Sequence, residues 1–463
     1  MKSMIRAMFA AAVLMVSACS SDGDLTPPLT VTDNGRYLAT KNGDSFFWLG
    51  DTGWLLFRKL NREEALQYLD DRKEKGFNVI QAVLVHDIRN NTNIYGDSAI
   101  VANSLDRPLT TEGTSPDDPA GYDYWDHVDY IVRQARERGI YMALLPVWGS
   151  NVRSGRVTAE QARNYARWLA ERYRKESNII WVNGGDVRGS DSTAVWNAIG
   201  TTLREGDPGH LITFHPFGRT QSSEWFHNAP WLDFNMFQSG HKRYDQDTTG
   251  LSYGEDNWRY MQDDWSRTPV KPSLDGEPSY EAIPQGLHDP SQPYWGPSDV
   301  RRYAWWSVFA GACGFTYGHN AVMQFHKPGD ENPAYGVKEY WDEALDAPGS
   351  SQLIHLKELI LSKPFFDRVP SQELLTGVDG TGYYHIAVTR GEGYALAYTC
   401  NGSVINIDTD KLGWREFEAS WLNPADGTLA RIGTFGCRGP AAFDPPGDSE
   451  QGNDWVLIIN RLH

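Results

Sequence analysis

Eight short apolar segments alternate with helix-like stretches between residues 46 and 362, and this alternation constrains the fold more than any other feature. The apolar segments occupy residues 46–51, 78–85, 141–147, 178–183, 211–215, 233–238, 271–276 and 314–317. Helices are expected in most of the gaps, for example after the capping residues Asn61 and Thr158. Near-continuous apolar strands separated by helices are typical of buried parallel sheets. Eight of them predict an α/β protein with a closed (β/α)8 TIM barrel.

A doubly wound open sheet is the main alternative fold. Such a sheet would usually carry a glycine-rich phosphate turn after its first strand, and residues 50–54 do not form one. The long insertions at residues 86–123 and 281–297 both follow predicted strands. In a barrel they therefore belong to the face formed by the C-terminal ends of the strands, where barrel active sites lie.

The pattern changes after residue 370. Short strand-like segments separated by Gly- and Asn-containing turns predict a small all-β sandwich domain over residues 369–463, which follows a catalytic barrel over 31–368. Asp408 opens a segment that hints at a calcium loop, but Leu412 offers no ligand oxygen at the fifth position. The cysteine and histidine spacings form no zinc motif, so no metal and no cofactor are predicted.

The N-terminus resembles a bacterial lipoprotein signal. Lys2 and Arg6 precede an apolar run too short to span a bilayer, and small residues then precede Cys19. We expect a signal peptide over residues 1–18, lipidation of Cys19 and a tether over 19–30. These features predict a protein of the bacterial periplasm or cell surface, lipid-anchored to the outer membrane. A plain secretory signal with an incidental cysteine is the alternative.

The net charge of −17 argues against nucleic acid or an anionic membrane surface as a partner, which leaves the lipid anchor as the expected membrane contact. The chain contains 18 Trp, 22 Tyr and 18 Phe, and such flat rings suit the faces of sugars, although many of them must form the core. Cys313 is expected to be inert core, while Cys400 and Cys437 either pair or stay free.

Polar and aromatic residues gather where the predicted strands end, and in a barrel those positions form the active site. The candidate substrate-binding residues are Asp51, Trp54, Gln81, Trp148, Asn183, Arg188, His215, Gln238, His241, Tyr280, Tyr317 and His319. A structural role is an equal alternative for His215, Gln238, His241 and Tyr280.

Two carboxylic acids, Asp186 and Glu277, follow the fourth and seventh predicted strands. Glycoside hydrolysis needs two carboxyl groups around one bond, because one protonates the leaving oxygen while the other attacks the sugar or activates water. Gly184 and Gly185 precede Asp186 and allow a sharp turn there. Asp275 shares a strand face with Glu277 and is the rival nucleophile. For either acid alone, a structural ion pair or a helix cap is the alternative.

Several stretches at the predicted strand ends closely resemble the apiosidase-like glycoside hydrolases of family 140. These stretches are residues 48–54, 181–186, 215–216, 238–241, 275–281 and 314–318. Residues 420–427 resemble the domain that follows this barrel in the family, which carries a collagen-binding name. The resemblance implies retaining cleavage of the apiose–galacturonate linkage in the pectin rhamnogalacturonan II, with a pectic oligosaccharide as substrate. It also implies that Asp186 is the acid/base and Glu277 the nucleophile.

One feature departs from the wider clan of such glycosidases, in which the acid is usually a Glu directly after Asn. Asp186 instead follows Gly185, and its shorter side chain requires a closer substrate, which suits a small furanose. We expect Glu277 to be ionised and Asp186 protonated at working pH.

Cations recur in the loops expected above the barrel: Arg58, Arg89, Arg153, Arg156, Arg188, Lys242 and Arg243. They predict an electropositive rim for galacturonate carboxylates, with scattered solvated charges as the alternative. Two other functions stay open, namely a glycosidase of the same fold acting on another furanoside or a galactoside, and a non-catalytic glycan-binding lipoprotein. Pocket shape separates the first of these from an apiosidase, and loops set pocket shape.

Overall fold

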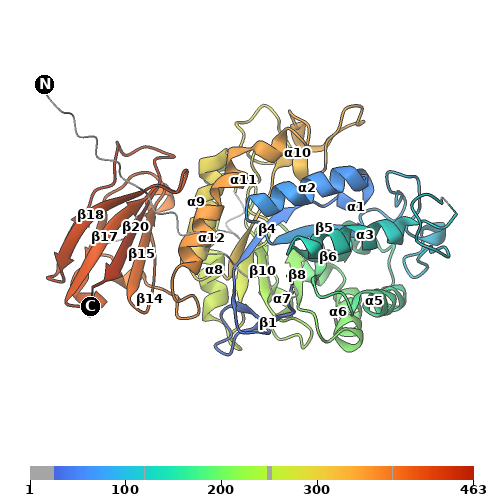
Figure 1. Ribbon diagram of the computed structural model, residues 1–463, viewed down its shortest axis with the longest axis horizontal. Coiled ribbons are helices and arrows are strands. Elements are labelled where there is room, and N and C mark those ends of the chain that lie inside the picture. Colours follow the sequence, from blue (N-terminus) through green and yellow to red (C-terminus); the bar gives the residue numbers. More distant parts are fainter. Residues whose placement is uncertain (1–24, 119, 248–252, 378, 463) are drawn as a thin grey trace, which may run out of the picture.

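The computed structural model describes residues 25–118, 120–247, 253–377 and 379–462. Its centre is a barrel of eight parallel strands, which confirms the predicted fold class (Figure 1). These strands are β4 (Trp48–Thr52), β5 (Val79–Val85), β6 (Tyr141–Val147), β7 (Ile179–Val187), β8 (Ile212–Pro216), β10 (Asn235–Gln238), β11 (Ser273–Asp275) and β12 (Gly314–Tyr317).

The ladder of strands runs from β8 through β7, β6, β5, β4, β12 and β11 to β10, and the short antiparallel β9 (Thr220–Gln221) adds to β10. The two ends of this ladder meet. The N–H of Asp233 donates to the carbonyl of Ile212 at 2.8 Å, and the hydroxyl of Thr213 donates to the carbonyl of Phe234 at 2.7 Å. These bonds close the sheet into a barrel, so an open doubly wound sheet is excluded.

Helices surround the barrel (Figure 1). The main ones are α2 (Arg62–Glu74), α3 (Tyr124–Glu137), α5 (Ala159–Tyr173), α6 (Thr193–Gly206), α8 (Asn257–Ser266), α9 (Pro297–Phe309) and α12 (Ile354–Leu361). Asn61 and Thr158 cap α2 and α5, each in a capping box with the residue three positions later. The connection from β8 to β10 carries only the one-turn helix α7 (Ser223–Phe226), so the helical layer is thin there.

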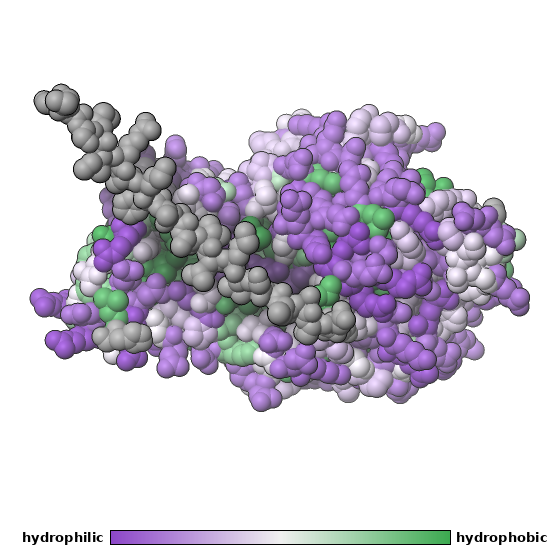
Figure 2. Space-filling view, viewed as in Figure 1, coloured by the Kyte–Doolittle hydropathy of each residue, from purple (hydrophilic) through white to green (hydrophobic). Residues whose placement is uncertain are grey.

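The barrel strands are buried on both faces, as their continuous apolar sequences require. Every residue of β5 and β6 is buried, with one set of side chains inside the barrel and the other against the helices. Eight of the 18 Trp are among the largest fully buried side chains: Trp48, Trp125, Trp181, Trp196, Trp231, Trp295, Trp305 and Trp306. Much of the high aromatic content is therefore core. In the view of Figure 2 the barrel surface is mostly hydrophilic, with hydrophobic residues in small separate areas.

A small antiparallel sheet of β1 (Leu29–Val31), β2 (Leu38–Thr40) and β3 (Ser45–Phe46) leads into the barrel. The hydroxyl of Tyr141 donates to the carbonyl of Pro27, and Thr26 is buried. The described part of the expected tether therefore joins the folded body. The expected signal peptide and Cys19 lie outside the described residues. None of the helices in the described part of the chain is long and apolar enough to cross a membrane.

The C-terminal part is all-β, as predicted. A six-stranded sheet has the order β13 (Val369–Pro370), β14 (Ala387–Gly391), β15 (Tyr394–Thr399), β20 (Trp455–Arg461), β17 (Glu416–Leu422) and β18 (Leu429–Gly436). The pair β16 (Ile405–Asp408) and β19 (Pro440–Phe443) encloses an apolar core with it. Ahead of β14 the chain forms the 3-10 turn η7 (Gly382–Tyr384). Cys313, Cys400 and Cys437 are all free, so the possible pairing of the last two does not occur here.

This β domain lies against the side of the barrel that α8, α9 and α12 cover (Figure 1). Arg301 of α9 makes a two-pronged ion pair with Asp454, with nitrogen–oxygen distances of 2.8 and 2.6 Å. Trp305 stacks on Tyr398 with ring centroids 5.7 Å apart. Buried charge pairs and stacked rings at this boundary fix the two parts in one arrangement.

Candidate active site

A cavity of about 420 Å³ opens at the C-terminal ends of the barrel strands. Its lining comprises Trp54, Leu55, Lys59, His86, Trp148, Asp186, Gln238, His241, Glu277, Tyr280, Ile283, Leu287, Met323, Gln324 and residues 330–335. Both candidate catalytic acids are among them. The cavity therefore combines these two acids with aromatic walls and an opening to solvent, which is the composition of a small-ligand site.

The backbone of β7 directs Asp186 to this cavity. The pairing of β7 with β8 is interrupted by a bulge between Gly184 and Val187, and Gly184, Gly185 and Asp186 all have positive φ, at 89°, 107° and 51°. A Cβ on Gly184 would come within 2.5 Å of the carbonyl oxygen of His215. Glycine is required at that point, and Asp is among the few other residues that tolerate the left-handed region. The paired glycines thus allow the sharp turn that sequence suggested.

Glu277 lies two residues beyond β11 and is only 8 % exposed. Nε2 of His241 lies 3.2 Å from its Oε1, and Nε2 of His215 lies 3.0 Å from its Oε2, although off the line of a good hydrogen bond. The backbone N–H of Tyr280 donates to Nδ1 of His241 at 3.3 Å. That nitrogen is an acceptor, so the ring proton is on Nε2 and faces the carboxylate.

The two acids differ in their pKa values. Burial, and then the nearby charge of Glu277, raise the pKa of Asp186 to about 6. Burial by itself would also raise the pKa of Glu277, but the contacts with His215 and His241 outweigh it and lower the pKa to about 2. Between these two pH values Asp186 is protonated and Glu277 is ionised.

The rival nucleophile Asp275 is a structural residue. It is fully buried within β11 and does not line the cavity. Its Oδ2 accepts hydrogen bonds from the hydroxyl of Ser239 at 2.5 Å and from the amide of Asn257 at 3.0 Å. Burial raises the pKa of Asp275 to about 7. A carboxyl group that is enclosed and protonated in this way supports the floor of the site.

Five of the residues expected to bind substrate line the cavity: Trp54, Trp148, Gln238, His241 and Tyr280. The rings of Trp54 and Trp148 lie 5.2 Å apart at an angle of 57°, and the indole N–H of Trp54 donates to the hydroxyl of Tyr280 at 3.2 Å. This aromatic wall presents flat apolar surface of the kind that packs against the C–H face of a sugar.

Four other expected ligands are buried in the scaffold away from the cavity: Asp51, Gln81, Asn183 and Tyr317. Asp51 accepts from Arg72 of α2 at 2.7 Å, and the hydroxyl of Tyr317 donates to Glu281 at 2.7 Å. The amides of Gln81 and Asn183 donate to the carbonyls of Gly276 and Trp196, each at 2.8 Å. These groups hold strands and helices together, so direct contact with substrate is not their role.

The last three do not line the cavity. His215 is buried and contacts the lining residues Glu277 and Trp54 without lining the cavity itself. His319 is buried against Glu339, with Nε2 3.2 Å from the carboxylate, and its Nδ1 caps the short helix α10 (Asn320–Met323). Arg188 is exposed, and its guanidinium lies 5.3 Å from the ring of Phe217.

A second cavity, of about 300 Å³, adjoins the first. Asp186, Gln238, His241, Leu287 and Tyr335 line both, whereas Glu277 lines only the first. Arg219 and Lys242 line only the second. Asp186 therefore stands between the two spaces, with the other catalytic candidate on one side and two cations on the other.

Tyr335 and Arg219 are among the residues at these cavities that were not predicted. Tyr335 lies in a loop beyond β12 with φ at 55°, and burial and the charges of Glu277 and Asp186 raise its pKa. Arg219 has φ at 62°, and its Nε lies 3.6 Å from Asp247. The turn-forming residues 332–336 follow the last barrel strand, and that position is the one signal that could have indicated a loop over the site.

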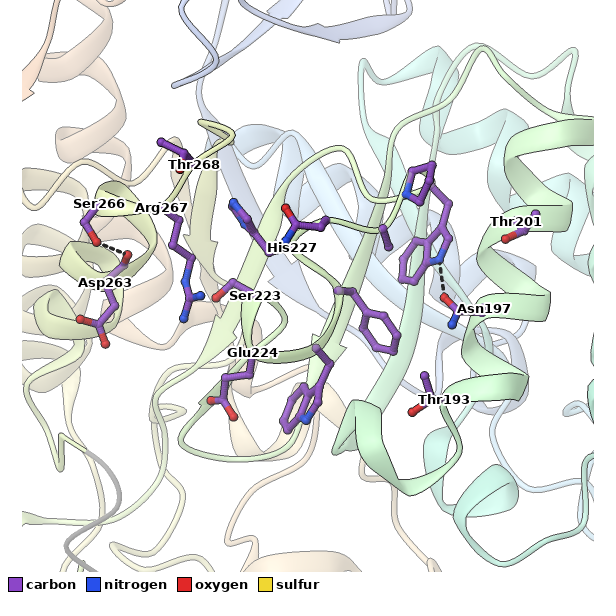
Figure 3. Close-up of a pocket in the computed structure, with 16 residues that line it drawn as sticks. Thr193, Asn197, Thr201, Ser223, Glu224, His227, Asp263, Ser266, Arg267 and Thr268 are labelled. Atoms are coloured by element: carbon purple, nitrogen blue, oxygen red, sulfur yellow. Dashed lines mark hydrogen bonds between the residues drawn. The ribbon is translucent and has the colours of Figure 1, made fainter.

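A larger cavity, of about 1120 Å³, lies on the outer side of the barrel between α6, α7 and α8 (Figure 3). It occupies the gap in the helical layer after β8. Two hydrogen bonds join residues that line it: the indole of Trp231 donates to the amide oxygen of Asn197 at 2.9 Å, and the hydroxyl of Ser266 donates to the carbonyl of Asp263 at 2.8 Å. Neither Asp186 nor Glu277 lines it, so the chemistry belongs to the smaller cavity at the strand ends. Among the described residues no group of three or more His, Cys, Asp or Glu could hold a metal ion.

Comparison with protein families gives a match over residues 32–367 to the "Apiosidase-like, catalytic domain". The chain belongs to the apiosidase-like glycoside hydrolases. Residues 369–460 match the "Putative collagen-binding domain of a collagenase". In a comparison with curated proteins, none matches the chain.

Solved structures agree with this family. One described as "Glycoside hydrolase" is 45 % identical, with a TM-score of 0.87 over 94 % of this chain and 97 % of that one. A family 5 glycoside hydrolase from Bacteroides vulgatus is 43 % identical, with a TM-score of 0.88 over 94 % of each chain. Another glycoside hydrolase from that organism is 14 % identical with a TM-score of 0.65, and shows the fold alone. This apiosidase-like protein is therefore a glycoside hydrolase with a carbohydrate substrate.

Proposed function

We propose that this apiosidase-like protein is a retaining glycosidase that cleaves the apiose–galacturonate linkage of rhamnogalacturonan II, with Glu277 as nucleophile and Asp186 as acid/base. One observation carries the proposal. Asp186 and Glu277 line one cavity from the fourth and seventh barrel strands, with pKa values of about 6 and about 2. Two carboxyl groups in opposite protonation states are what the first step of retaining hydrolysis needs.

In that first step an oxygen of Glu277 attacks the anomeric carbon, while Asp186 donates its proton to the glycosidic oxygen. The bond from the anomeric carbon to that oxygen breaks, and the leaving group departs as a neutral alcohol. The Nε2–H groups of His215 and His241 hold Glu277 ionised and oriented for the attack. The product is a covalent glycosyl–enzyme ester.

In the second step Asp186, now ionised, takes a proton from water, and the resulting hydroxide attacks the anomeric carbon from the side the leaving group vacated. Glu277 leaves as a carboxylate. Esterification of Glu277 removes the negative charge that raised the pKa of Asp186, so Asp186 becomes the base at the moment one is needed. Two displacements retain the anomeric configuration. Methanolysis followed by NMR tests this, because retention requires a methyl glycoside with the anomeric configuration of the substrate, whereas the opposite anomer would exclude Glu277 as nucleophile.

The charge of the second cavity supports an acidic leaving group. The acid/base must face the leaving group, so the cavity that contacts Asp186 but not Glu277 is the aglycone side. Lys242 and Arg219 line it, and no ion pair to Lys242 is found among the described residues. Galacturonate carries one carboxylate per sugar, which a cation at this position can bind.

A matched pair of variants tests the acidic aglycone. Lys242→Gln removes a cation from the cavity, and Arg89→Gln removes one that is exposed and paired with Asp87 at 3.5 Å. We expect Lys242→Gln to raise KM for galacturonate-linked substrates by about tenfold, the usual scale for one charged contact. KM for an aryl glycoside with a neutral leaving group should stay unchanged, as should both values in Arg89→Gln. Equal losses on acidic and neutral substrates in Lys242→Gln would contradict an acidic aglycone.

We also propose that the protein is a lipoprotein of the bacterial periplasm or cell surface, held on the outer membrane through Cys19. The basic, apolar and small-residue segments that precede Cys19 support this proposal. Metabolic labelling with a radioactive fatty acid tests it, with incorporation expected in the wild type and absent in Cys19→Ser. Equal labelling of both proteins would contradict it.

A further inference from the structure

The segment from His241 to Gln246 borders the aglycone cavity and is anchored at both of its ends. At its start, the carbonyl of His241 accepts from the N–H of Gly286 at 2.8 Å and from the indole of Trp295 at 3.1 Å. Both donors belong to the barrel. At its other end lies the 3-10 turn η3 (Tyr244–Gln246). Lys242, which lines the cavity, stands between the two anchors.

The second anchor is the carboxylate of Glu255, which is completely buried. Its Oε1 accepts from the backbone N–H of Tyr244 at 3.1 Å, and its Oε2 accepts from Nη2 of Arg302 at 2.8 Å. The hydroxyl of Tyr383 lies 3.1 and 3.0 Å from the two oxygens and donates to the carboxylate. A buried carboxylate keeps a fixed position only while such donors satisfy it.

Tyr383 belongs to the C-terminal β domain, within η7. The thiol of Cys400 donates to its carbonyl at 3.1 Å, and the ring of His385, two residues on, stacks on Trp258 of α8 at 4.1 Å. The ring of Tyr383 also meets that of Tyr244 edge-on at 5.7 Å. The β domain thus supplies both a donor to Glu255 and a surface against which the η3 turn packs.

From these contacts we infer that the C-terminal β domain is a working part of the aglycone site, and that Tyr383 is a positioning residue that sets the place of Lys242 through Glu255 and Tyr244. The inference rests on the proposed function to the extent that the second cavity receives the leaving group. It gives the β domain a role in substrate selection by the enzyme to which it is attached. That role differs from the collagen binding its family name describes.

The two anchors act on different parts of the reaction. The barrel alone holds His241, whose Nε2 contacts Glu277, so loss of the Tyr383 hydroxyl should leave the nucleophile undisturbed. The same loss should loosen Tyr244, and with it Lys242, although Arg243 and Gln246 keep their hydrogen bonds to Gln285 at 2.9 Å each. A displacement of about 1 Å in a side chain that positions substrate is enough to weaken its contact with the substrate substantially.

The test compares Tyr383→Phe with Tyr398→Phe in the full-length protein. Tyr398 is a matched control, because its hydroxyl also makes a buried hydrogen bond at the domain boundary, to Asp454 at 3.2 Å, but has no contact with the η3 turn. Tyr383→Phe should raise KM for galacturonate-linked substrates by about three- to tenfold. It should leave kcat on a neutral aryl glycoside and the acid limb of the pH profile unchanged. Tyr398→Phe should change none of these.

Hydrogen–deuterium exchange on the free proteins provides a readout that needs no substrate. Peptides that cover residues 239–247 should exchange faster in Tyr383→Phe than in the wild type and Tyr398→Phe. If both variants exchange alike in this segment, or if KM rises equally in both, Tyr383 has no positioning role. Faster exchange in Tyr383→Phe alone, in a protein that cleaves no galacturonate linkage, would uphold the contact while refuting the proposed substrate.

Discussion

The backbone N–H of Asp186 donates a hydrogen bond to Nδ1 of His215 at 3.3 Å. An N–H can donate only to an unprotonated ring nitrogen, so the proton of His215 is on Nε2, 3.0 Å from Oε2 of Glu277. One imidazole therefore connects the backbone of Asp186 with the carboxylate of Glu277. Because His241 is fixed in the same tautomer, both rings present an N–H to Glu277.

The pH profile of kcat/KM should be bell-shaped, with limbs near the two catalytic pKa values. Activity should fall below about pH 2 as Glu277 takes up a proton, and above about pH 6 as Asp186 loses the proton that it must donate. The activity that remains in Asp186→Asn should no longer fall at alkaline pH, because the group responsible for that fall is absent. Stopped assays over pH 2–9 measure this, and an activity maximum above pH 8 would contradict the assignment of Asp186 as acid.

Removing a histidine contact should raise the pKa of Glu277. In His241→Ala the carboxylate loses a donor at 3.2 Å while its burial, which favours the protonated form, persists. The acid limb should therefore move to higher pH, with a greater loss of activity at pH 3 than at pH 5. His319→Ala, which removes a buried histidine that contacts Glu339, is the control and should leave that limb in place. A limb that does not move in His241→Ala would show that this contact does not tune Glu277.

Asp186→Ala should lower kcat by about 10²- to 10⁴-fold on substrates with poor leaving groups, the usual range for loss of a general acid. The loss should be smaller on aryl glycosides, whose leaving groups need little protonation. Added azide should accelerate the variant on an aryl glycoside, since a small anion needs no base to attack the glycosyl–enzyme. Equal losses on good and poor leaving groups, without azide rescue, would point to a role in folding.

Asp275→Asn should keep most of the activity. Its free energy of unfolding should exceed that of the wild type by an amount that grows as the pH rises. The folded-state pKa of Asp275 is about 7, above its value in the unfolded chain, so the wild type loses stability between about pH 4 and pH 7 as the unfolded state gives up that proton. The variant avoids this loss, which amounts to at most roughly 4 kcal/mol for a shift of this size. Urea unfolding at pH 4 and pH 7 measures the difference. A variant as inactive as Glu277→Gln would instead favour Asp275 as nucleophile.

The barrel, and the position of Asp186 and Glu277 at the ends of its strands, could be predicted because they follow from local signals. The strands are continuous apolar runs, and a polar residue at the C-terminal end of a barrel strand points to the active-site face. These signals do not predict whether a side chain at the end of a strand points into the site or towards the surrounding helices. Asp51 is the penultimate residue of β4, but its side chain points outward to Arg72 of α2, because successive side chains of a strand alternate between the two faces of the sheet.

The cavity residues that lie in loops could not be predicted from the sequence either. Tyr335 and Arg219 lie in irregular segments with positive φ, where no periodicity predicts which way a side chain points. The same is true of Tyr383, which meets Glu255 across 128 residues of chain. Contacts of this kind depend on how two domains pack, and neither domain's own pattern contains that information.

The most direct test of the central claim is sugar release from rhamnogalacturonan II oligosaccharides by the wild type, Asp186→Asn and Glu277→Gln. The account predicts that the wild type releases apiose, or a side chain that ends in apiose. Glu277→Gln should release none and Asp186→Asn about 10²- to 10⁴-fold less than the wild type, while both variants still bind the oligosaccharide. Release of the same product by Glu277→Gln would contradict the assignment of the nucleophile. Absence of release by the wild type, with cleavage of a neutral furanoside instead, would contradict the substrate.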